Sequence, residues 1–277
     1  MSRTSAQVSS TATLVADARL QLAGAPPQEV LEWGLGAFPR GRIALCTSFQ
    51  DEGMVLLDMA WKIDPAISVF TIDSGRMPQD TLDLIEQVRE RYGIQVEVVY
   101  PDASEVSALV SEHGPNLFYQ STGLRLSCCA VRKVNPLQRR LANLDAWISG
   151  LRRHQTTERA EIGVVESDEL HGAILKLNPL AGWSSGQVLE YVADHRLPRN
   201  ALYSKGYTSI GCEPCTRPTE PGEDPRAGRW WWERGARECG LHYTLEVAED
   251  GSTRLAASHG LEPVPAATPS IREVEDA

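Results

Sequence analysis

The chain has 277 residues, of which 42% are hydrophobic and 23% charged, and this length and composition are typical of a globular protein with one large domain or two modest ones. Its net charge of −10 argues against non-specific binding to nucleic acid. Because it contains no apolar run of membrane-spanning length and no apolar signal core near its start, we expect a cytoplasmic protein.

The first 200 residues alternate between apolar runs and amphipathic segments. The N-terminal region, residues 1–39, is predicted to contain an arm with one short helix over residues 1–25 and a second helix at 26–38 that begins at a proline. Beyond them, strands are predicted at 42–49, 67–75, 94–101, 146–151 and 173–180, and helices at 52–63, 79–93, 104–114 and 184–197. This alternation predicts an α/β fold over residues 40–198, with a mostly parallel sheet and helices on both faces.

The composition changes at residue 199. Residues 199–243 are rich in Gly, Pro, Arg and Trp and hold three of the six cysteines, which predicts a loop-rich segment of the same domain. Residues 244–277 contain seven acidic residues, two arginines and several prolines. We expect them to form a solvated, disordered acidic tail.

Three polar loops follow predicted strands: SFQDEG (48–53), DSGR (73–76) and SGLRRHQTTER (149–159). Ligands bind at the carboxyl ends of strands in open parallel sheets, and the N–H groups of such turns attract anions. Together with Arg152 and Arg153, the loops favour a phosphate-bearing ligand. None of them matches the Walker or dinucleotide-binding pattern, and the acids of SFQDEG argue against a simple phosphate cradle.

Four cysteines form two pairs, Cys128–Cys129 in LSCCAVRK and Cys212/Cys215 in GCEPCTRP. Alone, Cys128–Cys129 is compatible with buried packing and Cys212/Cys215 with structural zinc or a redox dithiol. Together they supply the four thiolates of a zinc site or an iron–sulfur cluster. Thiolates of adjacent residues can bind different iron corners of a four-iron cluster more easily than they can both bind one tetrahedral metal ion. The cations Arg132 and Lys133, which follow the first pair, would offset the thiolates or face an anion.

The other two cysteines differ in their surroundings. Cys46 lies in an apolar run, which favours a packing role. Cys239 lies in RGARECGLHY, close in sequence to Arg237 and His242. A thiol among cations has a lowered pKa and is more nucleophilic, so Cys239 is either a catalytic nucleophile or an incidental exposed cysteine.

The motifs CCAVRK, GCEPCTRP, GRWWWE and ECGLH, with TSFQDEG, IDSGR and SGLRR, resemble the assimilatory adenylyl-sulfate (APS) reductases over roughly residues 40–243. The resemblance implies an adenine-nucleotide α-hydrolase fold, shared with PP-loop pyrophosphatases. It implies reduction of APS to sulfite and AMP, in sulfate assimilation and cysteine biosynthesis. The implied electron donor is thioredoxin or a glutaredoxin-like protein. The resemblance implies no nucleic-acid or membrane partner and is compatible with a homo-oligomer.

The resemblance also implies a role for each motif. Cys239 would attack the sulfur of APS and form an S-sulfocysteine, while Lys133 would lie between a [4Fe-4S] cluster and the substrate. The cluster ligands would be Cys128, Cys129, Cys212 and Cys215. The phosphosulfate would be held by Arg226 and Arg229, and the nucleotide site shaped by Ser48, Ser74, Gly75, Arg152 and Arg153, with His242 in the same site.

Three alternatives stay open. A reductase of the 3′-phosphorylated nucleotide PAPS would keep an ECGLH-like end, although such enzymes usually lack the four cluster cysteines. A PP-loop ATP-dependent ligase or tRNA-thiolating enzyme with structural zinc is disfavoured because SFQDEG departs from the SGGxDS-type loop. A non-catalytic iron–sulfur module would leave Cys239 dispensable.

Overall fold

The computed structural model describes residues 5–235, 238, 240–247, 249, 251 and 253–255, with the backbone alone described at 5–10, 245, 246 and 253–255. Cys239 and residues 256–277, most of the expected acidic tail, lie outside the described residues. No helix in the described part of the chain is long and apolar enough to cross a membrane.

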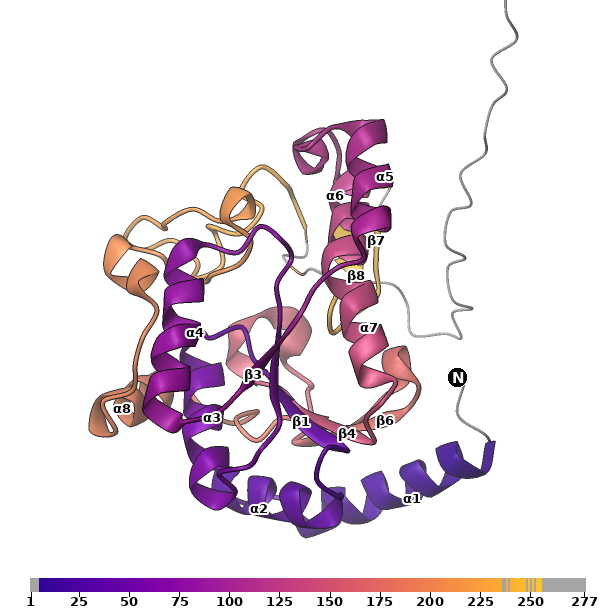
Figure 1. Cartoon of the computed structure of the whole chain (residues 1–277), viewed down its shortest axis with the longest axis vertical. Helices are drawn as coiled ribbons and strands as arrows, with labels where there is room; N and C mark the ends of the chain where they lie inside the picture. The colour runs from indigo at the N-terminus through magenta and orange to yellow at the C-terminus, as the bar shows by residue number, and fades with distance from the viewer. Residues whose placement is uncertain are drawn as a thin grey trace, which may run out of the picture.

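A six-stranded sheet forms the centre of the molecule (Figure 1). Its strands are β1 (Ile43–Cys46), β2 (Val69–Ile72), β3 (Val96–Val99), β4 (Ala146–Ile148), β5 (Val165–Asp168) and β6 (Ile174–Leu177). Their order is β3-β2-β1-β4-β6-β5, and every neighbouring pair is parallel except β5 with β6. The chain order reverses between β1 and β4, a topological switch point at which ligands commonly bind.

Helices cover both faces of the sheet, as the sequence predicts (Figure 1). The alternation of side chains along β1 explains this, because Ile43 and Leu45 face one core while Ala44 and Cys46 face the other. The first face packs against α1 (Ser5–Gln21), α2 (Pro27–Ala37), α3 (Asp51–Ile63), α4 (Gln79–Tyr92) and α8 (Ser185–Asp194). The second packs against α7 (Asn135–Leu141). The α/β class is therefore confirmed.

Two helices beside the sheet are joined by a wide turn. α6 (Thr122–Cys129) passes into a π-helical segment, η2 (Ala130–Val134), which continues into α7. Pro136 has no N–H to give the carbonyl of Arg132, so regular α-helical bonding cannot run through this turn. π-Helical turns often mark functional sites, and this one carries Arg132 and Lys133.

The remaining elements are short. α5 (Ala103–His113) begins at Asp102, whose carboxylate accepts the N–H groups of Ser104 and Glu105. The 3₁₀ segments are η1 (Leu117–Tyr119), η3 (Arg153–Gln155), η4 (Thr157–Arg159), η5 (Glu169–His171), η6 (Ala201–Lys205) and η7 (Glu213–Cys215). Of these, η3, η4 and η6 contribute residues to the pocket described below.

Both ends of the chain differ from the sequence-based expectation. Instead of an arm with a short helix, α1 packs along β5 and β6, burying Val15 and Leu22, and Arg19 Nε donates to the Val165 carbonyl at 2.9 Å. Tertiary contacts thus stabilise a segment with weak amphipathic pattern. Within 244–277, β7 (Leu245–Val247) and β8 (Thr253–Leu255) pair antiparallel in place of the expected disordered chain. The acid-rich composition of that range concealed this short pairing.

Candidate active site

A pocket of about 720 Å³ opens at the carboxyl ends of β1, β2 and β4, within the usual size range of small-molecule sites. Its walls come mainly from segments 46–53, 71–77, 147–155 and 199–212 and from the segment that carries Arg226, Arg229, Leu241 and His242. The three polar loops singled out in the sequence therefore meet at one edge of the sheet, because parallel strands end on the same side. The last two segments close the pocket from the loop-rich part of the chain.

One wall of the pocket carries positive charge. Lys133, Arg226 and Arg229 all line it. Arg229 is only 5% exposed, and its Nη1 donates to Ser209 Oγ at 3.3 Å and to the Ile210 carbonyl at 3.2 Å. Among the described residues its Nε has no hydrogen-bond partner although it is buried. This wall can accept an anionic group, since buried donors gain most from a charged acceptor.

Arg152 and Arg153 have different surroundings. Arg152 lines the pocket, but its Nη2 and Nε lie 2.7 and 2.9 Å from Glu52 Oε1, so a carboxylate already offsets its charge. Arg153 is not among the lining residues, and its Nε donates to the Ile162 carbonyl at 2.8 Å. Ser48 lines the pocket and accepts a hydrogen bond from Gln50 Nε2 at 3.0 Å. Arg152 and Ser48 are thus placed to shape the site, while Arg153 anchors its own loop.

The turn after β2 brings Ser74 and Gly75 to the edge of the pocket. Ser74 lines it, is 2% exposed, and places its Oγ 3.1 Å from Cys212 Sγ. Gly75 is not a lining residue; its φ of 70° allows the tight turn in which its N–H donates to Asp73 Oδ1 at 2.8 Å. Gly75 therefore sets the path of the loop, and Ser74 is the residue at the wall.

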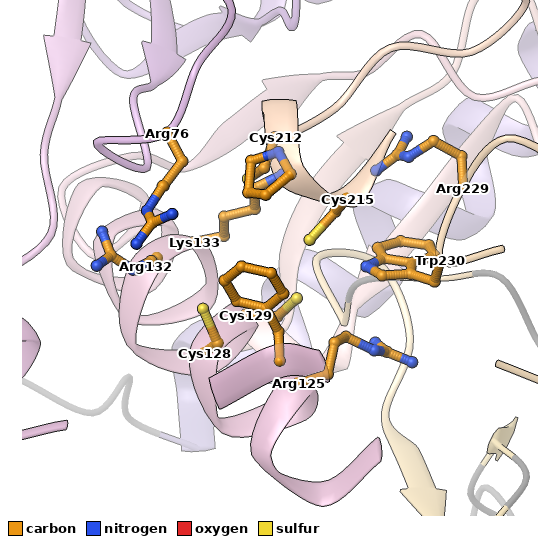
Figure 2. Close-up of a pocket in the computed structure, with 12 residues that line it drawn as sticks. Arg76, Arg125, Cys128, Cys129, Arg132, Lys133, Cys212, Cys215, Arg229 and Trp230 are labelled. Atoms are coloured by element: carbon orange, nitrogen blue, oxygen red, sulfur yellow. The ribbon is translucent and has the colours of Figure 1, made fainter. Parts of the chain in front are cut away.

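The four paired cysteines line a second cavity (Figure 2). Cys128 and Cys129 end α6, whereas Cys212 immediately precedes η7 and Cys215 is its last residue. Figure 2 shows the sulfur atoms of Cys128, Cys129 and Cys215 pointing into the space between helix and loop. Among the described residues, no three His, Cys, Asp or Glu side chains converge on a point that suits a single metal ion. The thiols are arranged around a space instead.

Cations surround these thiols and oppose the effect of burial. Burial raises the pKa of Cys215 to about 12 and also raises that of Cys128, the latter against the charge of Arg132. For Cys212 burial likewise disfavours the thiolate, but Lys133 and the hydrogen bond from Ser74 more than compensate, and the pKa lies below its ordinary value. Relative to an ordinary cysteine, the cavity therefore stabilises the thiolate of Cys212 and the neutral thiols of Cys128 and Cys215.

The donor set of this cavity fits an iron–sulfur cluster. Four thiols and nearby cations suit a group that is held by thiolates and carries negative charge. The indole N–H of Trp230 offers a further test, because this residue is 2% exposed, lines the cavity, and has no hydrogen-bond partner for Nε1 among the described residues. A sulfur acceptor in the cavity would satisfy it.

The two cavities share a wall. Lys133, Cys212 and Arg229 line both of them. In the sequence, only the resemblance to a known family placed Lys133 between the thiols and the substrate. In the structure, Lys133 lies in η2, and this π-helical turn directs its side chain toward the loop that carries Cys212. The positive charges of Lys133 and Arg229 therefore act both on a group bound in the thiol cavity and on a ligand bound in the pocket.

The segment after Trp232 closes the pocket near β4. Cys239 itself lies outside the described residues, but its neighbours in sequence Glu238, Leu241 and His242 line the pocket. The His242 imidazole stacks on the Trp147 indole, with ring centres 5.5 Å apart and planes at 9°. Trp147 is held in turn by a 2.8 Å hydrogen bond from Nε1 to Asp168. This stack fixes the chain three residues after Cys239.

Several site residues were not identified from the sequence. Arg159 lines the pocket and forms an ion pair with Glu238, 79 residues away in sequence. Arg125 is fully buried and contacts Cys129 and Glu233. Nothing local in the sequence marks such pairs, although Arg159 ends the SGLRRHQTTER loop and Glu238 begins ECGLH.

The fold and the pocket define an α/β protein that binds an anionic small molecule at the switch point of a parallel sheet. Residues 42–218 match the family model of the phosphoadenosine phosphosulfate reductase domain. The adenosine 5′-phosphosulfate reductase of Burkholderia cepacia is 45% identical over 219 residues, covering 79% of this chain and 87% of that protein. That of Allochromatium vinosum is 46% identical over 201 residues, covering 72% and 78%. The chain belongs to the PAPS/APS reductase family.

Solved structures agree with this membership. The phosphate complex of Candida auris phosphoadenylyl-sulfate (PAPS) reductase has a TM-score of 0.63 and 30% identity, covering 73% of this chain and 96% of that one. Candida glabrata FMN adenylyltransferase in complex with ATP has a TM-score of 0.51 at 14% identity, covering 93% and 78%. The second likeness concerns the fold alone.

Proposed function

We propose that this protein is an adenosine 5′-phosphosulfate reductase, which releases sulfite and AMP in sulfate assimilation and cysteine biosynthesis. The observation that carries the proposal is the cationic wall shared by a nucleotide-sized pocket and a four-thiol cavity. Its membership of the PAPS/APS reductase family, with relatives named for this activity, supports it.

The pocket supplies cations rather than a general acid. The substrate carries a sulfonate and a phosphate, and Lys133, Arg226 and Arg229 would bind these groups as charge moves onto the leaving phosphate. AMP is a stable anion, so its departure requires no proton. Ser48, Ser74 and Arg152, which line the same pocket, would hold the nucleotide.

Cys239 would act as the nucleophile. Its thiolate forms a bond to the sulfonate sulfur, the bond from that sulfur to the bridging oxygen breaks, and AMP leaves with the electron pair. A thiolate of a dithiol donor such as thioredoxin then attacks the Cys239 sulfur, and sulfite leaves. The donor's second thiol closes the donor disulfide and frees Cys239, so the dithiol supplies both electrons.

The four cavity cysteines, Cys128, Cys129, Cys212 and Cys215, would hold a [4Fe-4S] cluster. When bound, the cluster would supply a charged metal–sulfur centre against the shared wall. Lys133 and Arg229, on that wall, would remain oriented between the thiols and the substrate anions. We expect the cytoplasm to be the working compartment, where thiols are kept reduced.

Two measurements test this proposal. Anaerobically purified protein should be brown, with broad absorption in the blue, and should release sulfite from APS with thioredoxin. Cys239→Ser should abolish sulfite release while the absorbance and AMP binding survive. Retained turnover in this variant would remove Cys239 from the mechanism.

The substrate alternative is tested in the same assay. The enzyme should turn over APS in strong preference to PAPS, and the reverse preference would reassign it to the other branch of the family. Colourless protein that hydrolyses ATP would instead favour a zinc-containing PP-loop enzyme.

A further inference from the structure

Glu238 is the residue that precedes Cys239, and its carboxylate is buried among cations. It is 2% exposed. Arg159 binds it through two hydrogen bonds, Nε to Oε1 and Nη2 to Oε2, both 2.8 Å long. Arg226 approaches the same carboxylate, with Nη2 3.5 Å from Oε2. A bidentate arginine fixes both the position and the plane of a carboxylate.

The backbone of Glu238 is held from the opposite side. Arg125 Nη1 donates to the Glu238 carbonyl at 3.0 Å. Arg125 is itself immobilised, since it is fully buried, lies over the Trp230 ring at 4.8 Å, and donates to both carboxylate oxygens of Glu233. The residue before Cys239 is therefore anchored at two chemically different points by two different parts of the chain.

A buried ion pair of this kind is a poor source of stability. Desolvation of both charges can cancel or exceed their attraction, and apolar replacements are often equally stable. Such pairs are better explained by the geometry that they impose. Here the ion pair sets the position of two groups: the backbone of Glu238, which precedes Cys239, and the guanidinium of Arg226, which lines the pocket.

We propose that Glu238 is a positioning residue, whose carboxylate, bound by Arg159, fixes the chain at Cys239 and the orientation of Arg226. The proposal rests on the nucleophilic role of Cys239 proposed above. If Glu238 is a positioning residue, its loss should slow the attack of Cys239 on the substrate much more than it weakens substrate binding. Binding uses the whole pocket, whereas attack requires alignment of one thiol, and a misplacement of about 1 Å can lower a rate about 100-fold.

The test compares Glu238→Gln with Asp58→Asn in the full-length, anaerobically purified protein. Asp58 is a matched control because it is also 2% exposed, pairs with Lys62 Nζ at 2.6 Å and bonds to Tyr92 and Tyr191. None of these four residues lines the pocket. In single-turnover experiments with APS, Glu238→Gln should form the Cys239 adduct about 100-fold more slowly. Its affinity for AMP should change by less than about threefold. Asp58→Asn should form the adduct at the rate of the wild type.

A second readout does not depend on catalysis. Amide hydrogen exchange of a peptide covering 238–247 should accelerate at least about tenfold in Glu238→Gln and remain unchanged in Asp58→Asn. Combining Glu238→Gln with Arg159→Gln should add little to either single change, since both break one interaction. Independent, additive effects would contradict the assignment.

Besides additive effects in the double variant, three results would overturn the proposal: unchanged adduct formation in Glu238→Gln, unchanged exchange of its 238–247 peptide, or markedly tighter AMP binding. The last would mean that the carboxylate competes with the substrate for the arginines. If the wild type forms no adduct from APS, the proposed function fails. The exchange and coupling measurements then still decide whether Glu238 anchors this segment.

Discussion

His242 illustrates how neighbouring groups set the state of a single side chain. Burial lowers its pKa well below the ordinary value, and the charges of Lys176 and Arg159 lower it further. The imidazole, which stacks on Trp147, is therefore neutral at pH 7 in the folded protein. A charged ring in this place would be both desolvated and repelled.

This state predicts a pH dependence of stability. In the unfolded chain the imidazole binds a proton below about pH 6.5, and in the folded protein it does not. The free energy of unfolding should therefore fall as the pH drops below that value, with His242 contributing up to about 1.4 kcal/mol per pH unit. His242→Asn should flatten the slope in urea unfolding at pH 7, 6 and 5. His113→Asn, in a helix remote from the pocket lining, should not, and equal slopes in all three proteins would contradict the expectation.

The sequence indicated which residues lie together where a local motif carries them, and it did not where the partners are distant in the chain. The polar loops and the paired cysteines are local, and the structure brings them together at two adjoining cavities. Side-chain direction is not local information, so Arg152 and Arg153 were treated alike although only Arg152 lines the pocket. Arg159 and Glu238 acquire their roles only when the fold joins them.

At the scale of elements, apolar runs identified most strands, and their absence hid the others. β1 and β2 contain buried apolar side chains at nearly every position. β5 (VESD) is an antiparallel edge strand with polar residues, and α1 is rich in small residues, so neither has a strong pattern of its own. Both are stabilised by packing against each other, which periodicity cannot reveal.

The approach of α2 to the sheet depends on Gly34. A Cβ there would lie 2.4 Å from Leu177 Cδ1 and 3.4 Å from Ile43 Cδ1. Gly34→Ala should therefore lower the free energy of unfolding by about 1–3 kcal/mol despite the better helix propensity of alanine. Gly36 is the matched control on the same helix, because a Cβ there meets nothing within 4 Å. Gly36→Ala should leave stability unchanged or raise it by up to about 1 kcal/mol in chemical denaturation. Equal effects of the two changes would show that propensity, not packing, governs α2.

At the scale of the molecule, the net charge and the site have opposite signs. The chain carries −10, yet Lys133, Arg226 and Arg229 meet on one pocket wall. Acids elsewhere offset many of the other cations, as Glu52 does for Arg152. Overall charge therefore argues against non-specific nucleic-acid binding but has no bearing on a small anionic substrate.

The two ends of the chain should contribute differently to stability. Deleting residues 1–22 removes Val15, Ala18 and Leu22 from the core and uncovers β5 and β6. After the entropy of ordering the helix is subtracted, we expect a loss of about 2 kcal/mol or more in the free energy of unfolding. Because the acidic, proline-containing composition of residues 256–277 predicts a solvated tail, truncation after residue 255 should change it by less than about 0.5 kcal/mol. Comparable losses from both truncations would contradict this division.

The wall common to both cavities limits what a single substitution can report. Lys133 and Arg229 each face the thiols on one side and the nucleotide pocket on the other. Replacing either therefore perturbs two equilibria together, and a change in turnover cannot be attributed to one of them. Arg226 borders only the pocket and Cys128 only the thiol cavity, so these residues are the separable probes. Cluster binding by the four thiols should accordingly be measured with and without a nucleotide in the pocket. Nucleotide binding should likewise be measured with and without the cluster.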